Sequence, residues 1–396
     1  MSFLDSIKTL SQAYAKETVS FRRHLHANPE LSYEEFNTAK FIAEKLRSIG
    51  LQPQEGVATT GVVVLIQGKN PEKKTVALRA DIDALPITEE NKVEYKSKNV
   101  GVMHACGHDV HTSSLLGTAK ILNELKDQFE GTVKLIFQPG EEKNPGGASY
   151  MIKEGVLQNP APASILGQHV MPLLPVGKIG FREGMYMASS DELYLKVIGK
   201  GGHGAAPELT IDPIVIASHI IIGLQQVISR NANPKQPTVL TFGNIIGKGA
   251  TNIIPDEVNI AGTFRALNEE WRKEGLRRIV KMAEGIAESM GAKCEVTISH
   301  GYPFLNNDIE LTRRIRKAAE HYVGVDNVVD LDLAMGSEDF AYYSHVIPAS
   351  FYRLGTRNEA KGITSYVHTP TFNIDEDALA IGPGLMAWLA LTELGV

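Results

Sequence analysis

The chain has 396 residues, of which 43% are hydrophobic and 22% are charged, as in ordinary globular proteins. A net charge of −6, without runs of Lys or Arg, argues against nucleic acid and anionic membranes as partners. We find no signal peptide and no unbroken apolar stretch near the roughly 18 residues that a membrane span needs. Two cysteines in so long a chain favour a reducing compartment, so we expect a cytoplasmic protein.

Helix and strand patterns alternate over the first part of the chain. Ser32-Tyr33-Glu34-Glu35 matches a capping box and predicts a helix that ends at Gly50. A second helix is expected over residues 111–125. Apolar runs of strand length occupy residues 61–66, 75–78, 133–137 and 163–166. Short buried strands between helices predict an α/β fold with a mostly parallel or mixed sheet flanked by helices.

The pattern changes near residue 191. Predicted elements there follow the order strand, helix, strand, strand, helix, strand, which is the ferredoxin-like arrangement. They cover residues 191–198, 212–229, 238–246, 257–266, 269–290 and 293–299. Because so long a chain favours two domains, we predict a discontinuous α/β domain at 1–184 and 299–396. An α+β domain at 185–298 would be inserted into it.

Three predicted strands lead into side chains that bind metals or transfer protons. The run at 75–78 precedes Asp81 and Asp83, the run at 133–137 precedes Glu141-Glu142, and the run at 163–166 precedes His169. A single acid after a strand is usually a turn residue or a helix cap. Sites in open α/β sheets, however, form beyond the carboxyl ends of the strands, so three such ends together indicate a functional site.

The segment from His104 to His111 contains three His, one Cys and one Asp. Cys and His are ligands for zinc and similar metals, and carboxylates complete or support such sites. No second Cys-x-x-Cys pair follows, so the spacing differs from that of a zinc finger. A catalytic metal site with an open position fits better. The alternative is a polar loop whose His side chains cap a helix and whose Cys is inert.

Glu141 and Glu142 suggest a division of labour between adjacent carboxylates. One can bind metal while the other stays available as general base. Two metals roughly 3.5–4 Å apart would polarise a carbonyl and lower the pKa of a bridging water to about 7. The second Glu would then take the proton of that water. The alternative is a solvated acidic turn. His203, in a Gly-rich segment, and His368 are further candidates, although a lone His in such a turn is more often structural.

Five blocks of sequence, in order, resemble the M20 metallopeptidase family. Among its branches, the chain is most similar to the aminoacylases and hippurate hydrolases, a group that includes the plant auxin-conjugate hydrolases. The resemblance begins near Phe21 and extends to the C-terminus, and its Cys-Gly-His-Asp-x-His motif is highly specific. The blocks are residues 79–86, 104–112, 140–142, 202–203 and 368–370.

This resemblance implies a pair of divalent metal ions, such as Zn, Mn, Co or Ni, with a shared Cys thiolate. The implied ligands are Cys106, His108, Glu142, His169 and His368. Glu141 would be the general base and later the acid that protonates the leaving amine. Asp81 and Asp83 would contact the ligand side chains without binding the metal themselves. More distant members carry a His ligand near the position of Asp81, so that residue is not expected to bind metal itself.

The inserted domain would be a lid and dimerisation domain, which implies a homodimer or homotetramer. His203 would reach the active site of a partner subunit and stabilise the oxyanion or bind the substrate carboxylate. Asn252 and Arg265 are further candidates for contacts with that carboxylate. Relatives often have His where this chain has Glu208, and Leu where it has Gln168.

The expected reaction is hydrolysis of an N-acyl amino acid to a carboxylic acid and a free amino acid. A dipeptidase or carboxypeptidase would use the same chemistry. An enzyme of another class would use Cys106 as a nucleophile with a nearby His as base. A non-catalytic metal-binding or ligand-binding module is the third alternative, but it would have no need of a general base such as Glu141.

Overall fold

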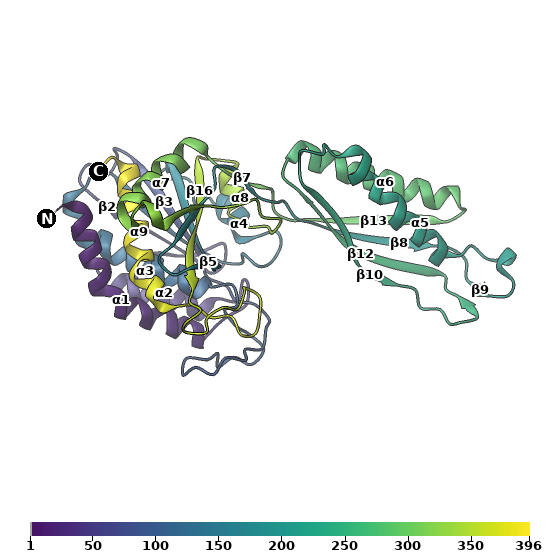
Figure 1. Ribbon diagram of the computed structural model, residues 1–396, viewed down its shortest axis with the longest axis horizontal. Coiled ribbons are helices and arrows are strands. Elements are labelled where there is room, and N and C mark those ends of the chain that lie inside the picture. Colours follow the sequence, from purple (N-terminus) through teal and green to yellow (C-terminus); the bar gives the residue numbers. More distant parts are fainter. Residues whose placement is uncertain (1) are drawn as a thin grey trace. The chain divides into compact units, whose positions relative to one another are not determined.

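The computed structural model describes residues 2–396, which form two compact units (Figure 1). The first unit comprises the residues up to Gly184, Asn306–Asp332 and Asp339–Val396. The second comprises Met185–Leu305 and Leu333–Glu338. The short strands β7 (Gly184–Met187) and β14 (Leu305–Asn307) lie where the chain passes between units. The role of the second unit as a lid and dimerisation domain stays a prediction.

The first unit is built on a mixed sheet, as the sequence predicts, and the sheet has eight strands. Four central strands run parallel, and the pairs β1–β2, β2–β4 and β16–β6 are antiparallel. The strand order is β1 (Gln54–Val57), β2 (Gly61–Gln67), β4 (Thr132–Gln138), β3 (Thr75–Asp81), β5 (Ser164–Pro175), β16 (Ala349–Arg357), β6 (Ile179–Phe181) and β15 (Val328–Asp330).

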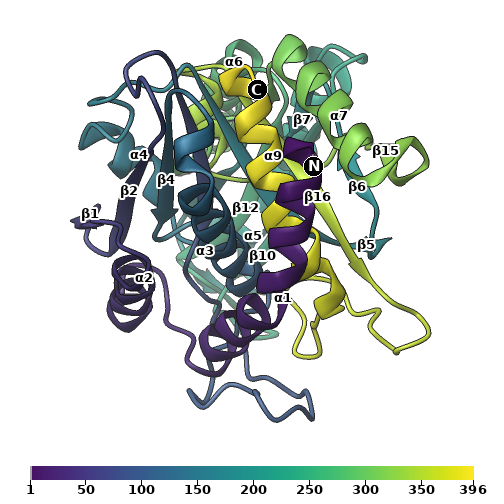
Figure 2. The same ribbon diagram turned by 90° about the vertical axis from the view of Figure 1, so that its left-hand side faces the viewer.

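Helices α1 (Phe3–Ala27), α3 (His108–Glu124) and α9 (Gly382–Leu394) pack together beside this sheet (Figure 2). Helix α2 (Phe36–Ser48) contacts α3, and α7 (Ile309–Val323) contacts α9. Their apolar faces and the strands share one core, which includes Leu78, Leu116 and Leu385. The shorter helices α4 (Gly147–Lys153) and α8 (Ala341–Ser344) contact each other and the sheet.

The start of α2 differs from the prediction. The helix begins at Phe36, and its N-cap residue Glu35 makes no side-chain capping bond. Ser32 donates instead to Asp83 Oδ2 at 2.7 Å, and Glu35 accepts from Thr60 and from a distant backbone N–H. The predicted capping box is therefore wrong, because both of its polar side chains bind partners far along the chain.

Helix α3 begins at His108, three residues earlier than expected. Its N-cap residue Gly107 has a φ of +84°, a conformation that favours glycine. A Cβ at this position would lie 2.6 Å from the side chain of Val170, so no larger residue fits. This tight turn carries the chain directly from Cys106 into the helix and places His108 and Asp109 in its first turn.

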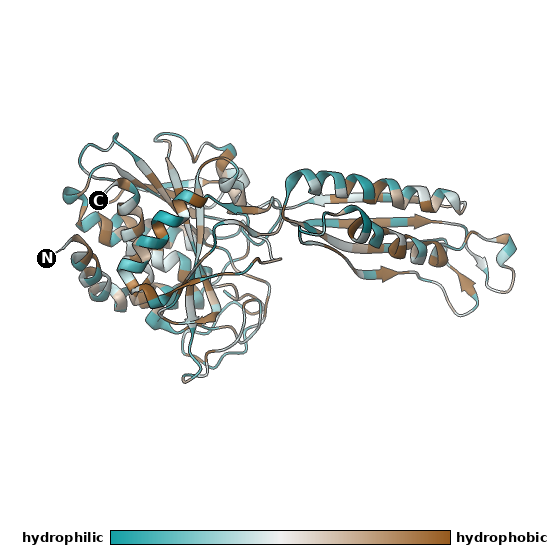
Figure 3. Cartoon of the chain, turned by 45° about the horizontal axis from the view of Figure 1, so that its top comes forward, coloured by the Kyte–Doolittle hydropathy of each residue, from teal (hydrophilic) through white to brown (hydrophobic). Residues whose placement is uncertain are grey.

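The second unit has the predicted β-α-β-β-α-β order. Its antiparallel sheet has the strand order β10 (Thr238–Ile246), β12 (Glu257–Ala266), β8 (Asp191–Ile198) and β13 (Lys293–His300). Helices α5 (Pro213–Gln226) and α6 (Glu269–Ser289) pack on it through a core that includes Leu195, Ile220 and Ile279. Figure 3 shows apolar brown segments along the strands and a largely hydrophilic α6.

Two helical stretches, Pro213–Asn231 and Glu376–Leu394, are long and apolar enough to cross a membrane by composition. Neither is an unbroken apolar run, because polar residues interrupt both. They are weak evidence for a membrane location, since core helices pass the same test. The second stretch is 72% buried within the structure.

Candidate metal centre

The three strand ends that carry acids and histidine lie at one edge of the sheet. Strands β3, β4 and β5 are parallel, and Asp81 pairs with Gln138. Arg79 pairs with Gly167, so His169 is level with Asp81. Glu141 and Glu142 follow the end of β4 by a few residues. The convergence of these strand ends follows from parallel pairing, as expected for open α/β sheets.

The five predicted metal ligands form two overlapping groups. Cys106, His108 and His169 offer ligand atoms that all lie within 4.8 Å of one another, and so do Cys106, Glu142 and His368. The Sγ atom of Cys106 lies 3.5 Å from Nε2 of His169 and 3.3 Å from Nε2 of His368. Cys106 thus belongs to both groups, which is the position of a shared ligand.

Among the described residues, two buried atoms in this cluster have no hydrogen-bond partner other than candidate ligand side chains. They are Nε2 of His108 and Oε1 of Glu142. Nδ1 of His108 lies 2.9 Å from the carbonyl oxygen of Asp83 and so carries a proton, which leaves Nε2 as the ring nitrogen that a metal could bind. An unsatisfied buried polar atom costs about 1–3 kcal/mol. A divalent cation would remove this cost, and the mixed N, O and S donor set fits Zn and its neighbours.

The imidazole of His169 also points its Nε2 toward the other candidate ligands. Its Nδ1 lies 2.7 Å from the carbonyl oxygen of Val170, so Nε2 faces Cys106 without a proton. Burial and the nearby Arg353 hold the pKa of His169 well below its ordinary value. The ring therefore stays neutral, which is the form that binds metal.

Asp81, Asp83 and His111 lie behind this cluster. Nδ1 of His111 is 2.5 Å from Asp81 Oδ1, and its Nε2 accepts the N–H of Val170 at 2.9 Å, so both ring nitrogens are engaged. Asp83 faces Nδ1 of His108 through Oδ1 and accepts the N–H of Glu142 through Oδ2. Burial would raise the pKa of Asp81, but His108, His111 and Arg79 hold it well below its usual range.

Glu141 lies at the rim of the cluster. Its side chain is largely buried, and its Oε2 lies 3.9 Å from Nε2 of His108. It belongs to neither of the two groups that contain Cys106, although it forms a further group with His108 and Glu142. The carboxylate is thus beside the candidate ligands without completing either overlapping group.

Helix α1 contributes a buried charge network that the sequence patterns do not predict. Arg22 Nε donates to Asp109 Oδ2 at 2.8 Å, and Nδ1 of His26 lies 2.8 Å from the same oxygen. All three side chains are fully buried. They fix the residue that follows His108 in the first turn of α3. An Arg and a His one turn apart, on the same helical face as Leu25 and Phe21, were the signal that could have revealed it.

His203, Asn252 and Arg265 all lie in the second unit. His203 is in β9 (Gly202–His203), which pairs with β11 (Ile253–Ile254). The N–H of Ala205 donates to Nδ1 of His203 at 3.0 Å, so the proton of the neutral ring is on Nε2. The side chain of His203 is exposed and can donate to a ligand.

Asn252 lies close to His203 in the structure, whereas Arg265 lies far from both. The carbonyl oxygen of Asn252 accepts the N–H of Gly204 at 2.8 Å. Arg265 lies near the far end of β12, eight residues beyond Glu257, or about 26 Å at the usual rise of a strand. There it donates to Thr263 and Ser337.

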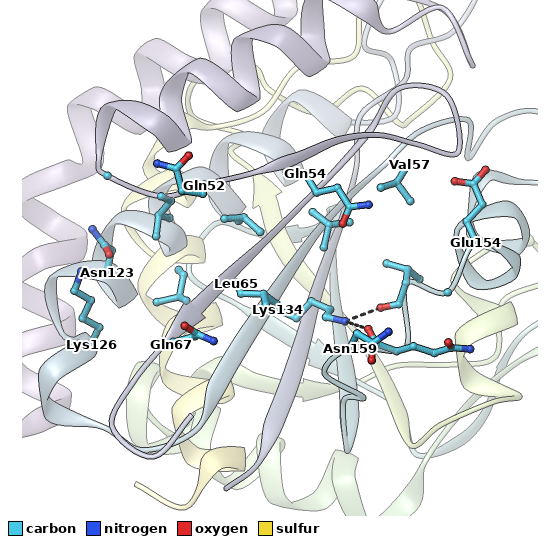
Figure 4. A pocket seen from close by; sticks show the side chains of 18 of the residues that line it. Gln52, Gln54, Val57, Leu65, Gln67, Asn123, Lys126, Lys134, Glu154 and Asn159 are labelled. Carbon is cyan, nitrogen blue, oxygen red and sulfur yellow. Dashed lines mark hydrogen bonds between the residues drawn. The ribbon is translucent and has the colours of Figure 1, made fainter. Parts of the chain in front are cut away.

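A cavity of about 670 Å³ lies over strands β1, β2 and β4, at one edge of the sheet (Figure 4). Many of its lining residues carry amides, including Gln52, Gln54 and Asn159. The ammonium of Lys134 donates there to the carbonyl oxygens of Val156 and Gln158, and burial lowers its pKa to about 8. The described residues that line this cavity include none of the predicted site residues.

Residues 77–392 match the family described as peptidase family M20/M25/M40. The chain belongs to this family. It is 41% identical to thermostable carboxypeptidase 2 of Saccharolobus solfataricus over 99% of both chains. It is 42% identical to N-acetyl-L-cysteine deacetylase of Bacillus subtilis, over 92% of this chain and 85% of that protein. An IAA-amino acid hydrolase of Arabidopsis thaliana is 40% identical over 95% of this chain and 85% of its own length.

A solved structure from Bacillus subtilis, described as a dinuclear metal-binding peptidase of the M20 family, has the same fold. It superposes with a TM-score of 0.83 at 36% identity, covering 96% of this chain and 99% of that one. The names of these relatives support a metal-dependent amidohydrolase. The family membership predicted from the five sequence blocks is thereby confirmed.

Proposed function

We propose that this M20 hydrolase cleaves the amide bond of N-acyl amino acids and releases a carboxylic acid and a free amino acid. One observation carries the proposal: Cys106 belongs to two groups of ligand side chains, and the carboxylate of Glu141 lies beside them. Two divalent ions would be held by Cys106, His108, Glu142, His169 and His368.

When bound, such ions polarise a carbonyl and make a water acidic enough to attack it near neutral pH. Glu141 accepts the proton of the attacking water and later delivers it to the leaving amine, which would otherwise depart as an unstable anion. Asp83 keeps Nδ1 of His108 protonated and holds the backbone of Glu142. His111 holds the backbone beside His169.

The choice of substrate rests on the named relatives. Two of them act, by name, on an N-acetyl amino acid or an amino acid conjugate, whereas the third is a carboxypeptidase. All these substrates have an amide bond and can carry a carboxylate on the leaving side, so the same centre serves each. We favour N-acyl amino acids, and a dipeptidase or carboxypeptidase is the second candidate.

A screen of N-acyl amino acids against the metal-loaded enzyme tests this choice. We expect release of free amino acid from hippurate or N-acetylmethionine, with little release from unblocked dipeptides. Release measured with ninhydrin after matched incubations would compare the two classes. Faster turnover of dipeptides than of every N-acyl amino acid would favour the peptidase instead.

We further propose that His203 acts on the active site of a partner subunit. The exposed Nε2 donor suits an oxyanion or a carboxylate, and Asn252 lies beside it. If Arg265 contacts the same substrate, the length of β12 between them means that His203 and Arg265 come from different copies. A homodimer is the smallest assembly that allows this.

Mixing two inactive variants tests action between subunits. His203→Ala is expected to impair turnover while keeping full metal content, because this residue lies outside the ligand groups. Glu141→Gln is expected to be inactive for a different reason. Heterodimers of the two contain one site with both wild-type residues, so part of the activity should return. No recovery in heterodimers verified by mass spectrometry would exclude action in trans.

A further inference from the structure

The turn that carries Glu141 is held by the segment of residues 32–35, which we call the brace. The brace lies more than one hundred residues earlier in the sequence. It has the pattern of a capping box, yet its side chains do not cap α2. Ser32 and Glu35 bind instead to groups around the turn, either directly or through one residue. The question is what this connection does for the turn.

Two buried carboxylates accept the backbone N–H groups on either side of Glu141. Glu35 Oε1 accepts the N–H of Gly140 at 2.9 Å, and Asp83 Oδ2 accepts the N–H of Glu142 at 3.0 Å. Both acceptors are fully buried. Ser32 donates to the same oxygen of Asp83 at 2.7 Å, so the brace contributes to both anchors. The backbone of Glu141 is therefore fixed from both directions.

Tyr33 adds a steric contact to these hydrogen bonds. Gly140 has a φ of +61°, and a Cβ there would lie 2.4 Å from Cζ of Tyr33, so the ring packs directly on the turn. Tyr33 itself has a φ of +67°, which is uncommon and strained for a bulky residue. Such a conformation persists only where surrounding contacts hold it, and here those contacts are with the turn.

We infer that Glu35 is a positioning residue that sets the orientation of Glu141 for proton transfer. It touches the backbone of Gly140 and the hydroxyl of Thr60, and it contributes to neither ligand group. Asp83 anchors Glu142 independently of it, so loss of Glu35 should loosen the Glu141 side of the turn while the ligand side stays held. The bond from the N–H of Gly147 to the carbonyl oxygen of Gly140 would remain. This inference rests on the proposed role of Glu141 as general base.

The test compares Glu35→Ala with Glu35→Gln. Alanine leaves the N–H of Gly140 buried without an acceptor and lets the turn move. A displacement near 1 Å can cost about 100-fold in rate, so we expect kcat to fall about 10- to 100-fold with KM nearly unchanged. Glutamine retains a carbonyl oxygen for Gly140 and an amide that can donate to Thr60. It should therefore keep kcat within about threefold of wild type, as this contact needs only an acceptor.

Metal content and a matched core variant separate positioning from general loss of stability. Glu35→Ala should keep the metal content of wild type, measured by inductively coupled plasma mass spectrometry. Ile42→Ala, in the buried face of α2, should lower the melting temperature while leaving kcat unchanged. If Glu35→Ala does not fold, Glu35→Asp serves in its place, because the shorter side chain cannot reach both partners.

The outcomes also distinguish this inference from the proposed function. If Glu141→Gln is inactive while Glu35→Ala has normal kcat, the inference fails and the general base stands. If Glu35→Ala loses metal, or if Glu35→Gln is as impaired as Glu35→Ala, Glu35 has a role other than positioning and the inference is overturned. If Glu141→Gln retains turnover, the proposed mechanism itself fails.

Discussion

Glu141→Gln should lose turnover by about 10²- to 10⁴-fold while its metal content stays that of wild type. The amide has the shape of the carboxylate but cannot accept a proton from the attacking water. Neither group of ligands around Cys106 includes Glu141, so the metal should remain. Steady-state kinetics and metal analysis on the same preparation measure both quantities.

Glu142→Gln is the matched control for this variant, because the residues are adjacent and the substitution is identical. Oε1 of Glu142 lies 3.3 Å from Nε2 of His368, and both residues belong to one of the ligand groups that contain Cys106. We therefore expect this variant to lose metal and activity together. Near-normal turnover in Glu141→Gln, or metal loss from both variants, would contradict the assigned division of labour.

Chelation should abolish activity, and added Zn, Mn, Co or Ni should restore it. Ligand atoms of five side chains converge here, most of them buried, and a bound cation would be shared between the two groups. Dialysis against EDTA, followed by titration with each metal under otherwise fixed conditions, measures the recovery. The metal that restores the highest kcat/KM at stoichiometric loading would be the preferred ion.

Metal removal by EDTA also tests whether Cys106 acts as a nucleophile. A cysteine hydrolase would stay active in EDTA. Burial and the charge of Glu142 raise the pKa of the Cys106 thiol, whereas nucleophilic cysteines have a lowered pKa. A bound cation would reverse this preference and stabilise the thiolate. Alkylation by iodoacetamide does not discriminate, since Cys106 is essential in both mechanisms. Full activity after verified metal removal would overturn the proposed function.

Much of the fold could be predicted because its signals are local. Strands β2, β3, β4 and β5 are apolar runs. In the second unit, the helical and strand patterns each extend over enough residues to identify the element. The site was visible for a similar reason. Few side chains bind metals well, so His, Cys and acids at strand ends and in residues 104–111 were distinctive without coordinates.

The tertiary structure alone decided what the polar residues of 32–35 and of α1 do. A capping bond contributes about 1 kcal/mol, whereas a buried hydrogen bond to a charged group contributes about 1.5–3 kcal/mol. Ser32 therefore donates to Asp83, and Glu35 accepts from the N–H of Gly140, instead of capping the start of α2. These partners are distant in sequence, and no periodic pattern encodes such pairings.

The sequence by itself determined the family, four of the sheet strands and the candidate ligands, because each depends on residue type and local spacing. The structure decided that Cys106 lies in both ligand groups and that Glu141 is anchored on both sides. It also decided that His203 lies in β9 whereas Arg265 lies in β12, eight residues beyond Glu257. These relations depend on how distant segments pack, and that packing is determined by all the residues of the hydrophobic core together.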